Sequence, residues 1–210
     1  EPEDDIEIII DKSKQELSYL FSGKGAAKFD LRWHSDLQGY SLNREAIQRG
    51  YGNRFGDLKT KIKIADSISQ LQLNSLEIVK DDLPFEVYQI MKADIYGQNG
   101  IDLKPFSYYM GLNQLSKAEL EDYRILFSQS MVSDLPDSIL AQSPNYLLFL
   151  SNMLIAQLQL EHPNDPSYHL QNIYSNNFSD LCSVIRTNYT GALREKLLLY
   201  NLLSLKVQDT

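Results

Sequence analysis

The sequence predicts a mainly α protein: a multi-helix antiparallel bundle with a small β-containing N-terminal segment. Apolar residues recur at helical spacing through most of the chain from about residue 55 onward. Helix-start signals recur along the same part of the chain, at Pro84, Ser116, Ser143 and Asp165. Residues 1–35 differ from the rest of the chain, because they contain short β-compatible runs in place of a helical pattern. Short connections between the predicted helices favour antiparallel neighbours.

The chain is long enough and apolar enough to fold around its own core. It has 210 residues, of which 43% are hydrophobic, and chains of this length usually bury a core without disulfide bonds. We predict a single domain over residues 1–210, with a β-containing start at 1–35 and a helical body at 55–207. No low-complexity linker in the sequence favours a boundary between domains.

The N-terminal part predicts a β-hairpin or two edge strands. Ile6–Ile10 and Leu17–Phe21 are short β-compatible runs separated by a polar connection. Ser22–Lys28 (SGKGAAK) has closely spaced glycines but lacks the spacing of a phosphate-binding loop, so it predicts a tight turn. Alternation over residues 29–34 permits a third strand, while a helix starting near Ala26 fits nearly as well.

The middle of the chain predicts an exposed connection and then two helices. Residues 40–56 are rich in Gly, Asn and charge, as exposed connections are. An irregular apolar stripe from Leu58 to Val79 predicts a long helix. Leu83–Tyr96 predicts a second helix, for which Gly97 supplies a left-handed stop, and residues 98–105 predict a loop.

The C-terminal half carries further helix starts. Ser116–Glu119 has the spacing of a capping box. Ser143–Pro144 places a cap and a first-turn proline before the apolar run Tyr146–Ala156, and Asp165–Pro166 repeats that device. The run is about half as long as a membrane span, so we expect a buried helix and no transmembrane segment. The last helix is expected to face solvent with Arg194, Glu195 and Lys196. Its leucines are expected on the opposite, buried side; they are Leu193, Leu197, Leu198, Leu202 and Leu205.

Charge and residue types argue against several functions. The formal net charge is -8, and without a basic stripe we expect no nucleic acid partner. Cys182 is the only cysteine, so the chain cannot hold an intrachain disulfide or a CxxC redox pair, and we expect a small core residue. His34, His162 and His169 do not have the spacing of a zinc motif. We therefore predict no catalytic, cofactor-binding or metal site, and no cofactor.

Carboxylate pairs are the remaining catalytic candidates. Glu119 with Glu121, or Asp134 with Asp137, offer an acid and a base of the kind that cleaves glycosides. Acidic residues at helix starts also stabilise the helix dipole, and that explanation accounts for these pairs without catalysis. An enzyme that uses carboxylates is thus the third hypothesis, after two binding functions.

Three segments resemble the helical region that precedes the thioredoxin-fold domain in TlpA-like thiol-disulfide oxidoreductases of Bacteroidetes. They are YLFSGKGAAKF at 19–29, LPFEVYQIMKADIYG at 83–97 and ALREKLLLYNLLS at 192–204. The resemblance implies a periplasmic or cell-envelope protein whose CxxC pair lies in a following thioredoxin-like domain, which is absent from this chain. It implies that residues 1–210 are a non-catalytic accessory module. Such a module would position or recognise protein partners or its own C-terminal domain, or would mediate self-association.

A second hypothesis is a stand-alone cell-envelope module that binds protein or glycan through aromatic loops. The aromatic residues in question lie beside His34, in the connection predicted at 40–56, and in a short segment just after the loop predicted at 98–105; they are Trp33, Tyr51, Phe55, Phe106, Tyr108 and Tyr109. A CxxC pair encoded beyond Thr210 would distinguish the accessory module from this alternative. The sequence leaves the oligomeric state open.

Overall fold

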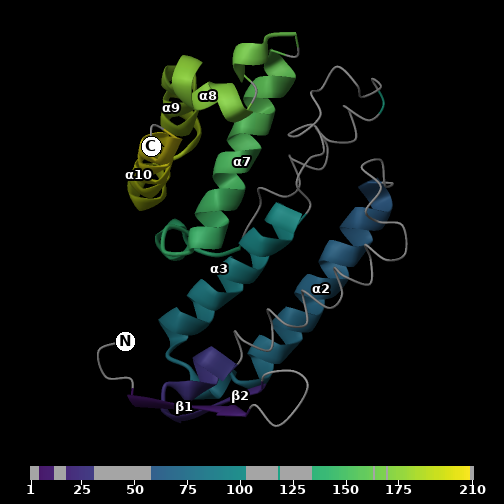
Figure 1. The fold of residues 1–210 in the computed structure, drawn as a ribbon, viewed down its shortest axis with the longest axis vertical. Helices are drawn as coiled ribbons and strands as arrows, with labels where there is room; N and C mark the ends of the chain where they lie inside the picture. The colour runs from purple at the N-terminus through teal and green to yellow at the C-terminus, as the bar shows by residue number, and fades with distance from the viewer. Residues whose placement is uncertain are drawn as a thin grey trace. The chain divides into compact units, whose positions relative to one another are not determined.

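The computed structural model describes residues 5–11, 18–30, 58–102, 118, 134–162, 164–168 and 170–208. Over these residues the protein is mainly helical, with a two-stranded antiparallel sheet near the N-terminus (Figure 1). The predicted fold class is therefore confirmed. The chain divides into two compact units, Glu1–Lys92 and Ala93–Thr210. The single domain predicted from the sequence stays a prediction.

The sheet of the first unit is a hairpin of β1 (Asp5–Asp11) and β2 (Ser18–Lys24), as the sequence predicts. A tight turn follows it, where Gly25 has a φ of 89°. Residues 26–30 are helical. The helix predicted to start near Ala26 is therefore found, and the alternative strand is not present at residues 29 and 30. Phe29 stacks on Phe21 with ring centroids 6.2 Å apart, which holds this helical turn against the strand that precedes it.

Gly23 lies where β2 reaches the end of the ladder, opposite Ile6. Its φ of 96° belongs to the left-handed region, which L side chains rarely adopt. A Cβ at this position would also collide with the backbone carbonyl of Asp5 on the neighbouring strand. The glycine spacing of SGKGAAK thus serves backbone geometry, in agreement with the predicted tight turn.

The predicted long helix is α2 (Leu58–Ile78), and it is followed by the short 3-10 helix η2 (Lys80–Asp82). Ile68 and Leu76 are buried on α2, at 3% and 0% exposed. Both lie on the apolar stripe that predicts this helix, whereas Leu71 of the same stripe is 47% exposed. Residues 40–56 lie outside the described residues.

The end of α2 and the beginning of α3 (Phe85–Asp102) are joined by a clasp of three side chains, Glu77, Lys80 and Tyr88. The Tyr88 hydroxyl donates to Glu77 Oε2 at 2.6 Å, and Lys80 Nζ donates to Glu77 Oε1 at 2.9 Å. Lys80 Nζ also lies 5.4 Å from the centre of the Tyr88 ring. The hydrogen bonds from Tyr88 and Lys80 lower the pKa of Glu77, because they stabilise its charged form.

Helix α3 is longer than the sequence predicts, and its two glycines explain why. The helix continues through Gly97 and Gly100 to Asp102, so the predicted stop at Gly97 is wrong, and the loop predicted at 98–105 is wrong over residues 98–102; residues 103–105 lie outside the described residues. A Cβ on Gly97 would lie 2.6 Å from the Tyr146 Cα, and one on Gly100 would lie 2.7 Å from the Phe149 Cγ. Both glycines therefore permit close packing within the second unit instead of ending the helix.

In the second unit, Ser143 is the N-cap of α7 (Pro144–Glu161), which follows the short helix α6 (Asp137–Leu140). The Ser143 hydroxyl accepts a hydrogen bond from the Tyr146 backbone N–H at 3.0 Å and donates one to Asp94 at 2.5 Å. The predicted cap and first-turn proline are thus confirmed. The same hydroxyl also ties the start of α7 to α3, since Asp94 belongs to that helix.

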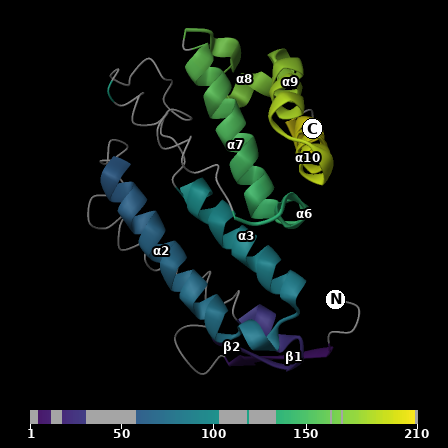
Figure 2. The ribbon, with the colours of Figure 1, turned by 180° about the vertical axis from the view of Figure 1, so that it is seen from behind.

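Helix α7 is the centre of the second unit's core. Leu150, Leu154 and Ile155 are 1%, 0% and 0% exposed, and most of the helix is buried around its whole circumference. It packs against α9 (Phe178–Asn188) and α10 (Gly191–Gln208), which lie beside it in both views (Figure 1 and Figure 2). The predicted buried helix is confirmed. No helix among the described residues is long and apolar enough to cross a membrane.

Between α7 and α9 the chain forms η4 (Pro166–Tyr168) and α8 (Leu170–Asn176). The Asp165 carboxylate accepts from the Ser167 backbone N–H at 2.9 Å, so the predicted cap exists but opens only a 3-10 turn. The longer helix that the Asp165–Pro166 device predicts begins instead at Leu170. The predicted capping box Ser116–Glu119 lies largely outside the described residues.

Candidate functional site

A shallow pocket lies where α7 ends, with a volume of about 440 Å³. His162, Asn164, Asp165 and Pro166 line it. His162 is the C-cap of α7, and its backbone N–H donates to Leu158. The pocket therefore sits on the connection between α7 and η4, at one end of the buried helix.

The loop around the pocket is held by hydrogen bonds and by a ring stack. The His162 and Tyr168 rings stack with centroids 4.0 Å apart and planes 14° apart. The Tyr168 hydroxyl donates to Asp180 of α9 at 2.6 Å, and this bond raises the pKa of Tyr168. Asn177 Nδ2 donates to the Ser167 hydroxyl at 2.6 Å. The loop is thus fastened to α9 and to the residue preceding it.

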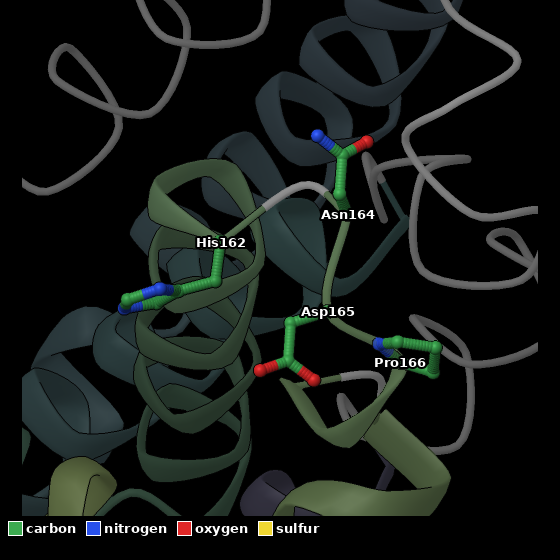
Figure 3. Close-up of a pocket in the computed structure, with 4 residues that line it drawn as sticks. All are labelled: His162, Asn164, Asp165 and Pro166. Atoms are coloured by element: carbon green, nitrogen blue, oxygen red, sulfur yellow. The ribbon is translucent and has the colours of Figure 1, made fainter.

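The side chains that line the pocket do not converge on one point. Figure 3 shows the His162 ring, the Asn164 amide and the Asp165 carboxylate directed away from one another. Across the described parts of the chain, no group of three or more His, Cys, Asp and Glu side chains could hold a metal ion. The arrangement can offer hydrogen bonds to a polar surface, but it does not bring an acid, a base and a nucleophile together.

Cys182 is not the fully buried core residue that the sequence predicts. Its side chain is only partly covered, although its neighbour Leu181 is 0% exposed on the same helix. Cys182 follows Leu181 by one position, so it turns away from the buried face of α9. Partial burial still raises the pKa of the Cys182 thiol, and the nearby Arg186 opposes that effect. A raised pKa makes the thiolate scarcer at neutral pH and the thiol less reactive.

The other candidate residues stay apart or lie outside the described residues. Asp134 and Asp137 are both exposed, at the approach to α6 and in its first turn, where an acidic side chain suits the helix dipole. Of the histidines, the structure describes His162, which is exposed. Glu119, Glu121, His34 and His169 lie outside the described residues, as do the six aromatic residues of the alternative binding function.

A buried polar cluster joins three helices of the second unit. Asn201 of α10 is 0% exposed, and its Oδ1 accepts from Ser151 of α7 at 2.6 Å and from Tyr174 of α8 at 3.0 Å. Asn201 Nδ2 donates to the Leu197 carbonyl at 2.8 Å. The sequence did not single out these residues. The cluster orders the packing of α7, α8 and α10 and is closed to solvent, so it is structural.

Helix α10 exposes an apolar stripe on the side away from this cluster. Leu199, Leu202 and Leu203 are 48%, 46% and 55% exposed, at the i, i+3 and i+4 positions of one helix face. Leu193 and Leu197 are buried as predicted, whereas the burial expected for Leu202 is wrong. This surface, which we call the α10 stripe, is the clearest apolar face on the described helices of the second unit.

Comparison with protein-family models, with curated proteins and with solved structures gives no significant match.

Proposed function

We propose that this chain is a non-catalytic helical accessory module of a TlpA-like thiol-disulfide oxidoreductase. In this proposal it positions or recognises protein partners, or mediates self-association, for a thioredoxin-fold domain that carries the redox chemistry. The parent protein would act in the periplasm or at the cell envelope.

The α10 stripe is the observation that supports this role best. Three leucines held half-exposed on one helix face suit a surface that another protein covers. The stripe stands on a rigid base, because the buried Asn201 lies on the same helix and is bonded to Ser151 and Tyr174. In the proposed parent protein, α10 would also be the described helix nearest in sequence to the following domain.

The thiol chemistry of the chain is consistent with a non-catalytic role. Exchange with a disulfide needs one thiolate to attack and a second thiol to resolve the mixed disulfide. Cys182 is the only cysteine in the sequence, and partial burial raises its pKa. The raised pKa makes the attacking thiolate scarcer, and the sequence offers no second thiol to resolve a mixed disulfide.

The proposal is tested by reading the coding sequence beyond Thr210 and then assaying the intact protein. We expect a strand and helix pattern that contains a CxxC pair. Removing residues 1–210 from that protein should leave its reduction of oxidised glutathione unchanged. Oxidised glutathione is a small disulfide, so its reduction does not depend on a module that recognises protein partners. A coding sequence without a thiol pair, or loss of this activity on removing the module, would contradict the proposal.

A further inference from the structure

The turn between α2 and α3, residues 77–88, presents two large apolar side chains to solvent, and we call it the elbow. Ile78 is 83% exposed and Phe85 is 75% exposed, more than any other large apolar side chain that the structure describes. Isolated exposed apolar residues are common on protein surfaces. Here two of them flank one turn, Ile78 at the end of α2 and Phe85 at the start of α3.

The elbow is fixed by contacts on both sides of these residues. The clasp joins Glu77 of α2 to Lys80 of η2 and Tyr88 of α3. Within the turn, the Asp82 N–H donates to the Val79 carbonyl at 3.0 Å. Tyr88 is 9% exposed, so the clasp has a buried ring beneath it. A fixed turn loses little conformational entropy when a partner binds, which favours binding.

The elbow is also acidic. Residues 77–86 contain four acidic side chains and one lysine, and that lysine, Lys80, is paired with Glu77. Asp81 and Asp82 lie between the two apolar residues in the sequence and Glu86 directly follows Phe85, and all three are exposed. A partner surface that covers Ile78 and Phe85 must therefore face negative charge, which complementary positive charge would stabilise.

We infer that the elbow is a docking site for a protein partner that presents an apolar face bordered by Lys and Arg. A second copy of this chain fits less well, because its net charge is -8 and like charges repel. An anionic membrane fits less well for the same reason. The inference rests on the proposed recognition role and deepens it, since it names the surface and the class of partner.

The test uses the full chain and two labelled peptides of about 20 residues, the length of a typical helical ligand. One peptide is an amphipathic helix with a leucine face bordered by lysines, and the other has glutamate in place of every lysine. Fluorescence anisotropy should show the lysine peptide binding at least about tenfold more tightly than the glutamate peptide.

Two elbow variants test the apolar and the charged part separately. Ile78→Ser combined with Phe85→Ser should raise the Kd of the lysine peptide about tenfold, the effect expected for loss of interface anchors. Asp81→Asn combined with Asp82→Asn should raise it about threefold and should flatten its dependence on salt. All four positions are exposed, so both variants should keep the wild-type unfolding transition.

Matched controls remove apolar surface and negative charge at positions outside the elbow. Leu20→Ser combined with Leu71→Ser takes exposed apolar surface from β2 and from the middle of α2, and Asp134→Asn combined with Asp137→Asn takes two charges from the approach to α6. Both should leave the Kd within about twofold of the wild type, the variation expected of residues that do not contact the ligand. Equal binding of both peptides, no binding of either, or wild-type binding by the elbow variants would overturn the inference.

The remaining outcomes separate this inference from the proposed function. If Leu202→Ser combined with Leu203→Ser loses binding and the elbow variants keep it, the elbow is not the docking site, while the accessory role stands. Vesicles of phosphatidylcholine and phosphatidylserine are tested in parallel, and binding to them that depends on Ile78 and Phe85 would overturn the inference in favour of a membrane. Failure of the proposed function itself would show as a missing thiol pair beyond Thr210, which the peptide assay does not measure.

Discussion

The Ser151 hydroxyl donates a hydrogen bond of 2.6 Å to Asn201, which lies 50 residues later in the chain and is 0% exposed. Tyr174 donates to the same Asn201 oxygen. One amide thus accepts from two hydroxyls, each of which comes from a different helix. This relationship connects α7, α8 and α10 inside the unit that carries the α10 stripe.

Replacing Asn201 should lower the free energy of unfolding more than replacing Ser151 does. Asn201→Ala removes the shared acceptor and leaves two buried hydroxyls without it, so we expect a loss of about 2 to 4 kcal/mol in the free energy of unfolding. Ser151→Ala leaves Asn201 bonded to Tyr174 and should cost about 1 kcal/mol. Urea denaturation measures both, with the exposed Asn176→Ala as the control. Equal losses for the two variants would show that the bonds do not share one acceptor.

A matched pair of Leu→Ala changes tests the two faces of the second unit. Leu154 of α7 is 0% exposed and Leu203 of α10 is 55% exposed. Leu154→Ala should cost about 2 to 5 kcal/mol, because it leaves a cavity in a packed core. Leu203→Ala should stay within about 0.5 kcal/mol of the wild type, as surface changes do. A loss below that value for Leu154→Ala would mean that α7 is not at the centre of the core.

Gly97→Ala should destabilise the protein although alanine favours helix. The gain in helix propensity is about 1 kcal/mol, but the added Cβ would collide with the backbone of Asn145 and Tyr146. We expect a net loss of roughly 1 to 3 kcal/mol, the range for an overpacked site. Gly100→Ala meets the Phe149 ring instead, which can shift, so its loss should be smaller. A Gly97→Ala protein at least as stable as the wild type would contradict the packing of α3 described above.

Stability should fall in alkaline solution between about pH 10 and pH 12. Burial raises the pKa of Tyr189 from 10.0 to about 12, so the folded state keeps a proton that the unfolded state releases above its ordinary pKa. The stabilisation is complete below pH 10 and is lost as the pH rises towards the folded value. Burial raises the pKa of Tyr174 and Tyr200 as well, and their effects have the same sign.

Tyr189→Phe should make this loss of stability less steep without abolishing it. Unfolding by urea at a series of pH values from neutral to alkaline measures the slope for both proteins. A variant that loses stability as steeply as the wild type would show that Tyr189 ionises at its ordinary pKa in the folded state.

The sequence predicts the main helices because their signals are local. Ser143 and Pro144 set the start of α7 through a cap and a fixed φ, and both act within one turn of the helix. The apolar run that follows is buried on all sides, as its composition predicts. The hairpin is equally local, since its strands are consecutive in the chain.

The features that the sequence does not predict depend on contacts between distant residues. Gly97 has the signature of a helix end, but a glycine also permits close packing, and only the position of α7 decides between the two. Asn201 stands in an apolar helix without any motif, and its partner Ser151 lies 50 residues away. The exposure of Leu202 follows from which face of α10 meets α7, which periodicity alone leaves open.

The most direct test of a non-catalytic module is the reduction of insulin disulfides by this chain with dithiothreitol as the electron donor. We expect a rate equal to that of the Cys182→Ser variant and to that of dithiothreitol alone, because a raised pKa leaves little Cys182 thiolate to attack insulin and the chain has no second thiol to release the mixed disulfide faster than dithiothreitol does. A rate above both controls, lost on the Cys182→Ser change, would contradict the account.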